Sequence, residues 1–324
     1  MYNREQLKEI IEKAIAGLQY TKEAEKLTDP VKYVLSIGGK RLRPVITLMS
    51  CNLFRDKIDE AVMPAAGVEV FHNFTLVHDD IMDNAPLRRS LPTVHTKWSL
   101  NQAVLSGDVM AFIANDCFLQ APSRCMAEVF RIYNKAAIEV CAGQQLDMDF
   151  EKAAAITEPD YIRMIGLKTA VLIAAAARIG GVIGGAAEKD CEYLYRFGLN
   201  LGLAFQFQDD LLDIYGDVNV FGKVLGGDIV ANKKTFLFVC ALEKGSWKQQ
   251  KRLHELFTMP NADPRSKVRE VMKIYEEINV KEAAELKVKD YVGKAFGYLE
   301  KTDVPPERKQ ELTRLANNMI GREK

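Results

Sequence analysis

The sequence carries one acidic pattern twice, as Asp79-Asp80-Ile81-Met82-Asp83 and as Asp209-Asp210-Leu211-Leu212-Asp213. Residues four apart on an α-helix lie on one face, about 6 Å apart along the axis, so each copy points two carboxylates the same way. Such carboxylates repel one another and are costly to bury without a cation. Oxygen ligands favour a hard ion, and Mg²⁺ usually takes one or two carboxylates together with substrate phosphates.

A solvated helix turn is the alternative interpretation of each acidic pattern, and a single copy would favour it. A solvated face belongs to a polar stripe, whereas both patterns follow residues typical of a core. These residues are Phe71, Phe74, Leu76, Val77, Leu201, Leu203, Phe205 and Phe207. We therefore interpret both patterns as functional.

Composition excludes several classes of protein. The chain has 324 residues and 48% apolar content, enough for a large core. Its 44 basic and 44 acidic residues cancel, so the sequence lacks the basic field of a nucleic-acid-binding protein. The most apolar stretch, 170–187, is interrupted by Arg178, which disfavours a membrane span.

Two further features indicate the cytoplasm. The six cysteines, Cys51, Cys117, Cys125, Cys141, Cys191 and Cys240, lie in apolar segments without CxxC spacing, which favours buried free thiols in a reducing compartment over structural zinc. The start, 1–11, is charged rather than apolar, unlike a secretory signal.

Helical periodicity runs through most of the chain, and strand alternation is hard to find. We predict an all-α fold, a single domain over 1–324 in which long helices surround a deep central cavity. The predicted helices are 5–27, 42–55, 59–84, 97–119, 124–151, 159–179, 187–215, a helix ending at Glu243, 265–277, 279–301 and 305–320.

Basic residues gather in the breaks that flank the acidic helices. They are Lys40, Arg41, Arg43, Arg88, Arg89, Lys168, Lys223, Lys233 and Lys234. Each alone is typical of a solvated surface charge. As a set they offer the guanidinium and ammonium donors that bind diphosphate groups.

These motifs resemble those of the trans-isoprenyl diphosphate synthases, the polyprenyl synthetases, over about residues 35–240. Seven motifs match in order: Gly38-Gly39-Lys40-Arg41-Leu42-Arg43-Pro44, His78 to Asn84, Leu87-Arg88-Arg89, Gly143-Gln144-Gln145-Leu146-Asp147, Lys168-Thr169, Phe205 to Asp213, and Gly222-Lys223 through Asp228 to Lys233. Ser90-Leu91 departs from the family pattern, and the first acidic motif lacks the two-residue insertion common in bacterial members.

The resemblance implies a role for each matching residue. Asp79, Asp83 and Asp209 would bind Mg²⁺, with Asp80, Asp210 and Asp213 supporting the metal shells. Isopentenyl diphosphate would be held by Lys40, Arg43, His72 and Arg89. The allylic diphosphate would be held by Arg88, Lys168, Lys223 and Lys233, with Thr169 and Gln206 facing the reacting carbons. The family is usually homodimeric, and we expect contact through the apolar helices around 100–150.

The resemblance also implies the reaction. Three Mg²⁺ ions would assist loss of diphosphate from the allylic substrate, and the isopentenyl double bond would attack the allylic carbocation. Apolar walls would exclude water from that cation. Holding the two substrates together would make their encounter effectively intramolecular.

Product length would depend on the depth of the cavity. Phe74 is the bulky residue five positions before Asp79, and the small Thr75 lies beside it. This pattern resembles members that form geranylgeranyl diphosphate, which we expect as the product, with farnesyl diphosphate as the alternative. Phe74 is alternatively an ordinary core residue.

Other functions remain as alternatives. A class I terpene cyclase would lack the second acidic motif and the isopentenyl-binding cations. A non-catalytic subunit of a heteromeric synthase often loses acidic residues, and all six are present here. A purely helical scaffold would not need clustered charges in apolar surroundings.

Overall fold

The computed structural model describes residues 1–21, 24–153, 155–216, 226–259 and 263–321. They divide into two compact units. The first unit comprises Met1–Lys135, Ala175–Tyr195 and Thr302–Leu312. The second comprises Ala136–Ala174, Arg196–Lys301 and Thr313–Lys324. A single domain over 1–324 stays a prediction.

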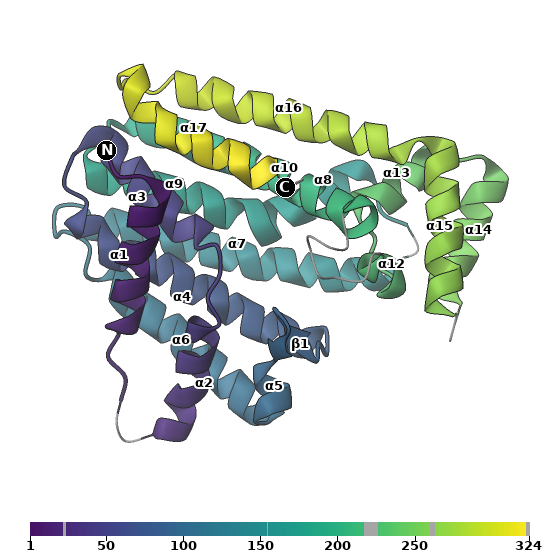
Figure 1. The fold of residues 1–324 in the computed structure, drawn as a ribbon, viewed down its shortest axis with the longest axis horizontal. Coiled ribbons are helices and arrows are strands. Elements are labelled where there is room, and N and C mark those ends of the chain that lie inside the picture. The colour runs from purple at the N-terminus through teal and green to yellow at the C-terminus, as the bar shows by residue number, and fades with distance from the viewer. Residues whose placement is uncertain (22–23, 154, 217–225, 260–262, 322–324) are drawn as a thin grey trace. The chain divides into compact units, whose positions relative to one another are not determined.

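The chain is helical almost throughout its described part (Figure 1). The elements are α1 (Arg4–Ala16), α2 (Glu25–Ser36), α3 (Leu42–Phe54), α4 (Asp59–Met82), β1 (Leu87–Arg88), β2 (Leu91–Pro92), α5 (Val94–Lys97), α6 (Leu100–Phe118), α7 (Met126–Lys152), α8 (Glu158–Ile165), the π-helix η1 (Gly166–Ala170), α9 (Val171–Gly184), α10 (Glu188–Tyr215), α12 (Gly227–Val230), α13 (Phe236–Lys244), α14 (Trp247–Thr258), α15 (Pro264–Ile278), α16 (Val280–Glu300) and α17 (Pro306–Ile320). The predicted all-α class is confirmed.

Several details differ from the predicted helices, and α14 was not predicted at all. The helix expected over 5–27 ends at Ala16, and α2 begins at Glu25. The stretch expected as one helix over 159–179 contains the π-helix η1. A short antiparallel hairpin, β1 and β2, follows the first acidic motif; its two-residue strands are too short to show alternation.

Helix starts follow local chemistry. Asn3 and Gln6 form a capping box at α1, and Thr157 and Asp160 form one at α8. In each, the cap side chain accepts from a backbone N–H that would otherwise lack an intrahelical partner. The third helix, α3, begins differently, because Arg41 precedes it in the left-handed region at φ 48°.

Helices α4 and α6 lie side by side and form the most extensive helix contact of the first unit (Figure 1). Gly107 on α6 allows this approach, since a Cβ there would lie 2.2 Å from Nε2 of His78. The core of the second unit gathers residues from α8, α10, α13, α15 and α16 around Phe207 and Phe236.

The stretch Glu158–Gly184 is long and apolar enough to cross a membrane, but 72% of its most apolar window is buried, as in a protein core. Cysteine burial follows the prediction at five of six positions. Cys141 is the exception, because it is exposed on α7; all six thiols are free.

Candidate functional site

The first acidic motif separates its aspartates into exposed and buried carboxylates. Asp83 is exposed and Asp79 partly exposed at the end of α4, whereas Asp80 is only 4% exposed. The guanidinium of Arg88 grips Asp80, with Nε 2.8 and 2.9 Å from the two carboxylate oxygens and a second nitrogen 2.7 Å from Oδ1. Burial raises the pKa of Asp80, and Arg88 opposes that rise.

The hairpin after α4 carries two predicted diphosphate ligands, Arg88 and Arg89. Its central residues, Arg89 and Ser90, have φ values of 52° and 64°. Positive φ at both central residues is the pattern of a two-residue type I′ turn, here without the usual glycine. Arg89 donates from its guanidinium to the carbonyl oxygen of Gly38. The hairpin therefore reaches back to the loop before α3.

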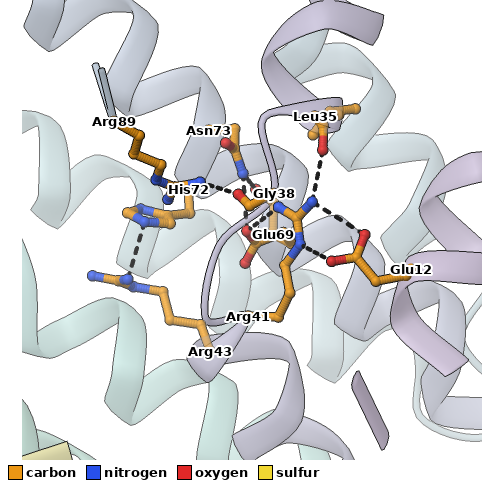
Figure 2. Close-up of polar contacts among 9 residues, drawn as sticks. All are labelled: Glu12, Leu35, Gly38, Arg41, Arg43, Glu69, His72, Asn73 and Arg89. Carbon is orange, nitrogen blue, oxygen red and sulfur yellow. Dashed lines mark hydrogen bonds and ion pairs between the residues drawn. The ribbon is translucent and has the colours of Figure 1, made fainter. Parts of the chain in front are cut away.

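Predicted isopentenyl diphosphate ligands meet in the first unit, as Figure 2 shows. A guanidinium nitrogen of Arg43 lies 3.1 Å from Nε2 of His72. Burial, and then the positive charges of Arg43 and Arg89, lowers the pKa of His72 well below its usual value. Because a guanidinium can only donate, Nε2 accepts and the imidazole is neutral. Lys40 is exposed on the same loop.

Arg41 is different from the other basic residues of this loop. Its side chain is fully buried, and its guanidinium binds Glu69, Glu12 and the carbonyl oxygen of Leu35 (Figure 2). Its grouping with the surface cations that meet a diphosphate was therefore wrong. The sequence could not reveal this, because the two carboxylates come from α1 and α4.

The predicted chain-length residues lie one turn before the first acidic motif. The ring of Phe74 contacts those of Phe71 and His78, with centroids 5.4 and 4.8 Å away. Phe71 in turn meets Tyr133 edge to face at 5.4 Å. The hydroxyl of Thr75 donates to the carbonyl oxygen of His72 at 2.7 Å. Phe74 is thus packed within an aromatic cluster of the first unit.

The second acidic motif, on α10, repeats the division of roles. Asp209 is exposed, whereas Asp210 is 3% exposed. Asp210 accepts from the hydroxyl of Tyr161, from the backbone N–H of Phe236 at 3.1 Å and from the amide of Gln206 at 3.1 Å. Burial, and then the nearby carboxylate of Asp228, raises the pKa of Asp210 to about 8, and the hydrogen bonds oppose that rise.

Asp213 accepts hydrogen bonds from the start of α12. Its carboxylate accepts from the backbone N–H of Asp228 at 3.0 Å, and its carbonyl oxygen accepts from Gly226 at 2.7 Å. Asp80, Asp210 and Asp213 thus each have protein partners. If these three aspartates support the metal shells as predicted, they would do so by fixing the helix turn that carries the more exposed aspartates.

Lys168 and Thr169 both lie on the π-helix η1, which is a frequent device at functional sites. Lys168 forms an ion pair with Asp147 of α7 at 2.5 Å. Gly143, one turn earlier on α7, allows this contact, since a Cβ there would lie 2.2 Å from the backbone nitrogen of Lys168. Thr169 donates to the side-chain oxygen of Gln206 at 3.2 Å.

The lysines after the second motif have different surroundings. Lys233 is partly exposed, and its backbone N–H donates to the carbonyl of Asp228 at 2.9 Å. Lys234 binds three backbone carbonyl oxygens at the end of α7, those of Phe150, Glu151 and Ala153, which was not predicted. Lys223 lies outside the described residues.

Sequence reasoning missed two residues that hold this chemistry in place. Glu69 is a lone carboxylate in the apolar run 65–71, and that isolation is a signal of a buried partner. Tyr161 carried no signal, since its partner Asp210 lies on another helix.

The donor set suits Mg²⁺ in its chemistry, because the exposed groups are carboxylate oxygens. Among the residues that the structure describes, no three acidic, His or Cys side chains converge into a cluster that would hold a cation by themselves.

Comparison with known proteins agrees with this geometry. The family model described as polyprenyl synthetase matches residues 24–278. A geranylgeranyl diphosphate synthase of Methanosarcina mazei is 39% identical over 238 residues, which cover 72% of this chain and 73% of the relative. A geranylfarnesyl diphosphate synthase of Natronomonas pharaonis is 37% identical over 257 residues, covering 74% and 75%.

A solved structure has a similar fold over the whole chain. A crystal structure of geranylgeranyl pyrophosphate synthase superposes with a TM-score of 0.94 at 39% identity, and the match covers 100% of both chains. The family model alone covers well over half of the chain. The chain belongs to the polyprenyl synthetase family, the trans-isoprenyl diphosphate synthases that its ordered motifs resemble.

Proposed function

We propose that this chain is a Mg²⁺-dependent prenyltransferase that condenses isopentenyl diphosphate head to tail with an allylic diphosphate. One observation carries the proposal. In both acidic motifs the middle aspartate is buried and partnered, whereas the first stays more exposed on the same helix turn. Such a turn keeps carboxylates at the surface where a cation can bridge them to a phosphate.

The two diphosphates would be held by different residues. Lys40, Arg43, His72 and Arg89 would bind isopentenyl diphosphate, and a neutral His72 would do so by a hydrogen bond rather than by charge. Arg88, Lys168, Lys223 and Lys233 would bind the allylic diphosphate. Asp79, Asp83 and Asp209 would hold the metal, for which we propose three ions that stabilise the leaving diphosphate.

Thr169 and Gln206 would stabilise the allylic cation. The hydroxyl of Thr169 donates to the oxygen of Gln206, and the amide of Gln206 donates to Asp210. Both side chains are therefore oriented, with oxygen lone pairs left over for a positive charge.

We propose geranylgeranyl diphosphate as the product, with Phe74 limiting its length. The aromatic packing of Phe74 against Phe71 and His78 supports a fixed ring, and the relative from M. mazei supports this length. Farnesyl diphosphate and a non-catalytic role in a heteromer remain the alternatives.

The test is a product analysis of the purified chain with Mg²⁺, isopentenyl diphosphate and each of the dimethylallyl, geranyl and farnesyl starters, read by mass spectrometry. A geranylgeranyl product from farnesyl diphosphate is expected. Turnover only of the shorter starters would make the chain a farnesyl synthase. Absence of turnover with every starter would refute the enzyme and favour the heteromer subunit.

Phe74→Ala tests the length limit, and Phe130→Ala is a matched control because it removes another partly buried ring of the first unit. Longer products are expected from Phe74→Ala alone. Unchanged products would return Phe74 to the status of an ordinary core residue.

We also propose a cytoplasmic homodimer. Leu105, Phe112 and Leu119 are 58%, 66% and 51% exposed and are spaced seven apart, so they follow one face along α6 to its C-cap. Sedimentation velocity tests the dimer, and a stable monomer would contradict it.

A further inference from the structure

The loop before α3 has an unusual backbone. Gly38 and Gly39 have φ values of 80° and 143°, and Arg41 has φ 48°. A non-glycine residue in the left-handed region is strained and persists where its surroundings fix it. The conformation of this loop must be fixed by specific contacts, because the loop carries Lys40 and leads directly into Arg43.

The side chain of Arg41 supplies that fastening. Two of its nitrogens lie 2.9 and 3.2 Å from the carboxylate of Glu12, and a third lies 2.7 Å from Glu69. It also donates at 2.6 Å to the carbonyl oxygen of Leu35, at the end of α2. The guanidinium thus ties α1, α2 and α4 to the start of α3 (Figure 2). Buried and engaged in this way, it has no route to a diphosphate.

The partner Glu69 is itself fixed. It is 2% exposed, and its carboxylate also accepts from the side chain of Asn73 at 3.0 Å. His72 lies three residues after Glu69, on the neighbouring position of the same helix face. Two parallel contacts therefore join the start of α3 to α4: Arg41 with Glu69, and Arg43 with His72.

A third contact holds the glycine end of the loop. Arg89 donates to the carbonyl oxygen of Gly38, and a Cβ at position 39 would lie 2.7 Å from its guanidinium. The loop between Gly38 and Arg43 is therefore fixed at both ends, and only Lys40 within it is exposed.

We infer that Arg41 is a positioning residue for isopentenyl diphosphate: its ion pairs with Glu69 and Glu12 hold the loop so that Lys40, Arg43 and His72 present their donors together. This inference rests on the proposed function of the chain. It predicts a selective loss, in which affinity for isopentenyl diphosphate falls and affinity for the allylic substrate does not.

The principal variant is the double substitution Arg41→Met/Glu69→Met. Removing both charges avoids a buried lone carboxylate, which would itself unfold the region. Asn73 keeps its hydrogen bond to the backbone carbonyl of Glu69 at 2.8 Å. Glu12, whose side chain is 40% exposed, can be solvated. Arg41→Lys is the conservative variant, keeping the charge without the planar fork.

Arg178→Met is the matched control. Arg178 also binds two carboxylates in the first unit, those of Glu188 and Glu192, and its side chain is 22% exposed. Thermal melting with and without substrate verifies that every variant is folded.

Steady-state kinetics then give KM for each substrate and kcat. The double variant is expected to raise KM for isopentenyl diphosphate by about tenfold or more, with the allylic KM within about twofold of wild type. Arg41→Lys should give a KM for isopentenyl diphosphate between those of wild type and the double variant. Arg178→Met should change neither KM.

If the double variant folds, three results would overturn the inference. These are unchanged KM values in the folded double variant, an equal rise in both KM values, or an equal effect of Arg178→Met. If the double variant does not fold, Glu12→Gln replaces it. This variant is expected to raise the KM for isopentenyl diphosphate by about threefold. An unchanged KM would overturn the inference. A wild-type chain without turnover would instead refute the proposed function itself.

Discussion

The two acidic motifs share one spacing but hold their middle aspartates by different means. Asp80 is paired with a cation, the guanidinium of Arg88. Asp210 is held by neutral donors, the hydroxyl of Tyr161, the amide of Gln206 and the N–H of Phe236. Both aspartates are almost fully buried. The same five-residue pattern therefore has two electrostatic solutions, and each leaves the preceding aspartate closer to solvent.

The difference predicts how the two turns respond to change. A buried carboxylate paired with a cation depends on that one partner, whereas a carboxylate among neutral donors loses one contact at a time. The second arrangement also permits a protonated carboxyl, because no buried cation opposes it. We therefore expect the loss of one cation to destabilise the turn of the first motif strongly. The contribution of the second motif to stability should instead depend on pH.

The largest effect should come from the preceding aspartates, where the two motifs are expected to behave alike. Asp79→Ala and Asp209→Ala should each lower kcat/KM by about a hundredfold to a thousandfold with Mg²⁺ present, because each removes a carboxylate that is proposed to hold the metal. Asp59→Ala, at the other end of α4, is the control. Near-normal turnover in either variant would show that the two motifs are not equivalent.

Removing the cation from Asp80 should separate the motifs. Arg88→Met leaves a carboxylate buried without its partner and should lower the free energy of unfolding by about 3–5 kcal/mol, measured by urea denaturation. The control is Arg55→Met, which breaks the exposed pair with Glu60 and should cost less than about 1 kcal/mol. A loss no greater than that of the control would contradict a buried, cation-dependent Asp80.

The pH response should reveal Asp210. With its folded-state pKa raised to about 8, the folded protein keeps a proton there that the unfolded chain releases near pH 4. Stability therefore falls as pH rises through this window and levels off above pH 8. Between pH 6 and 8 the fall should be roughly 2–3 kcal/mol in metal-free wild type.

The variant Asp210→Asn cannot titrate at this position and should lack that fall in urea denaturation. His72 and the other groups titrate in both chains, so the difference between them isolates Asp210. Parallel pH profiles would mean that Asp210 is ionised throughout.

The smallest effect should come from one neutral donor. Tyr161→Phe removes one of three hydrogen bonds to Asp210 and should cost about 1–2 kcal/mol in urea denaturation. Tyr215→Phe is the matched control, since the buried hydroxyl of Tyr215 has no hydrogen-bond partner among the described residues. If both substitutions cost the same, Tyr161 does not hold Asp210.

Much of the fold follows from the sequence. Helical periodicity predicted the long segments 42–55, 124–151 and 187–215 to within two residues at each end, because their apolar faces repeat over many turns. The break after Ala16 was missed, since the sequence before and after it continues the same mixed pattern.

The site was predictable in its members but not in their partners. The ordered motifs identified Asp79, Arg43 and Lys168 as candidates. They could not show that Arg88 grips Asp80, that Asp147 pairs with Lys168, or that Arg41 turns inward. Each of these contacts joins separate elements, so local sequence carries the charges and only the packing decides which of them face a ligand.

The π-helix η1 has a consequence for the tolerance of this chain to insertions and deletions. Its wider turn accommodates an extra residue, which a regular helix would place about 100° further round the axis. Deleting one residue within Gly166–Ala170 would restore a regular helix but rotate α8 against the segment that follows. Tyr161 would then turn away from Asp210. We therefore expect related sequences to keep the length of this segment constant, together with Lys168 and Thr169 within it.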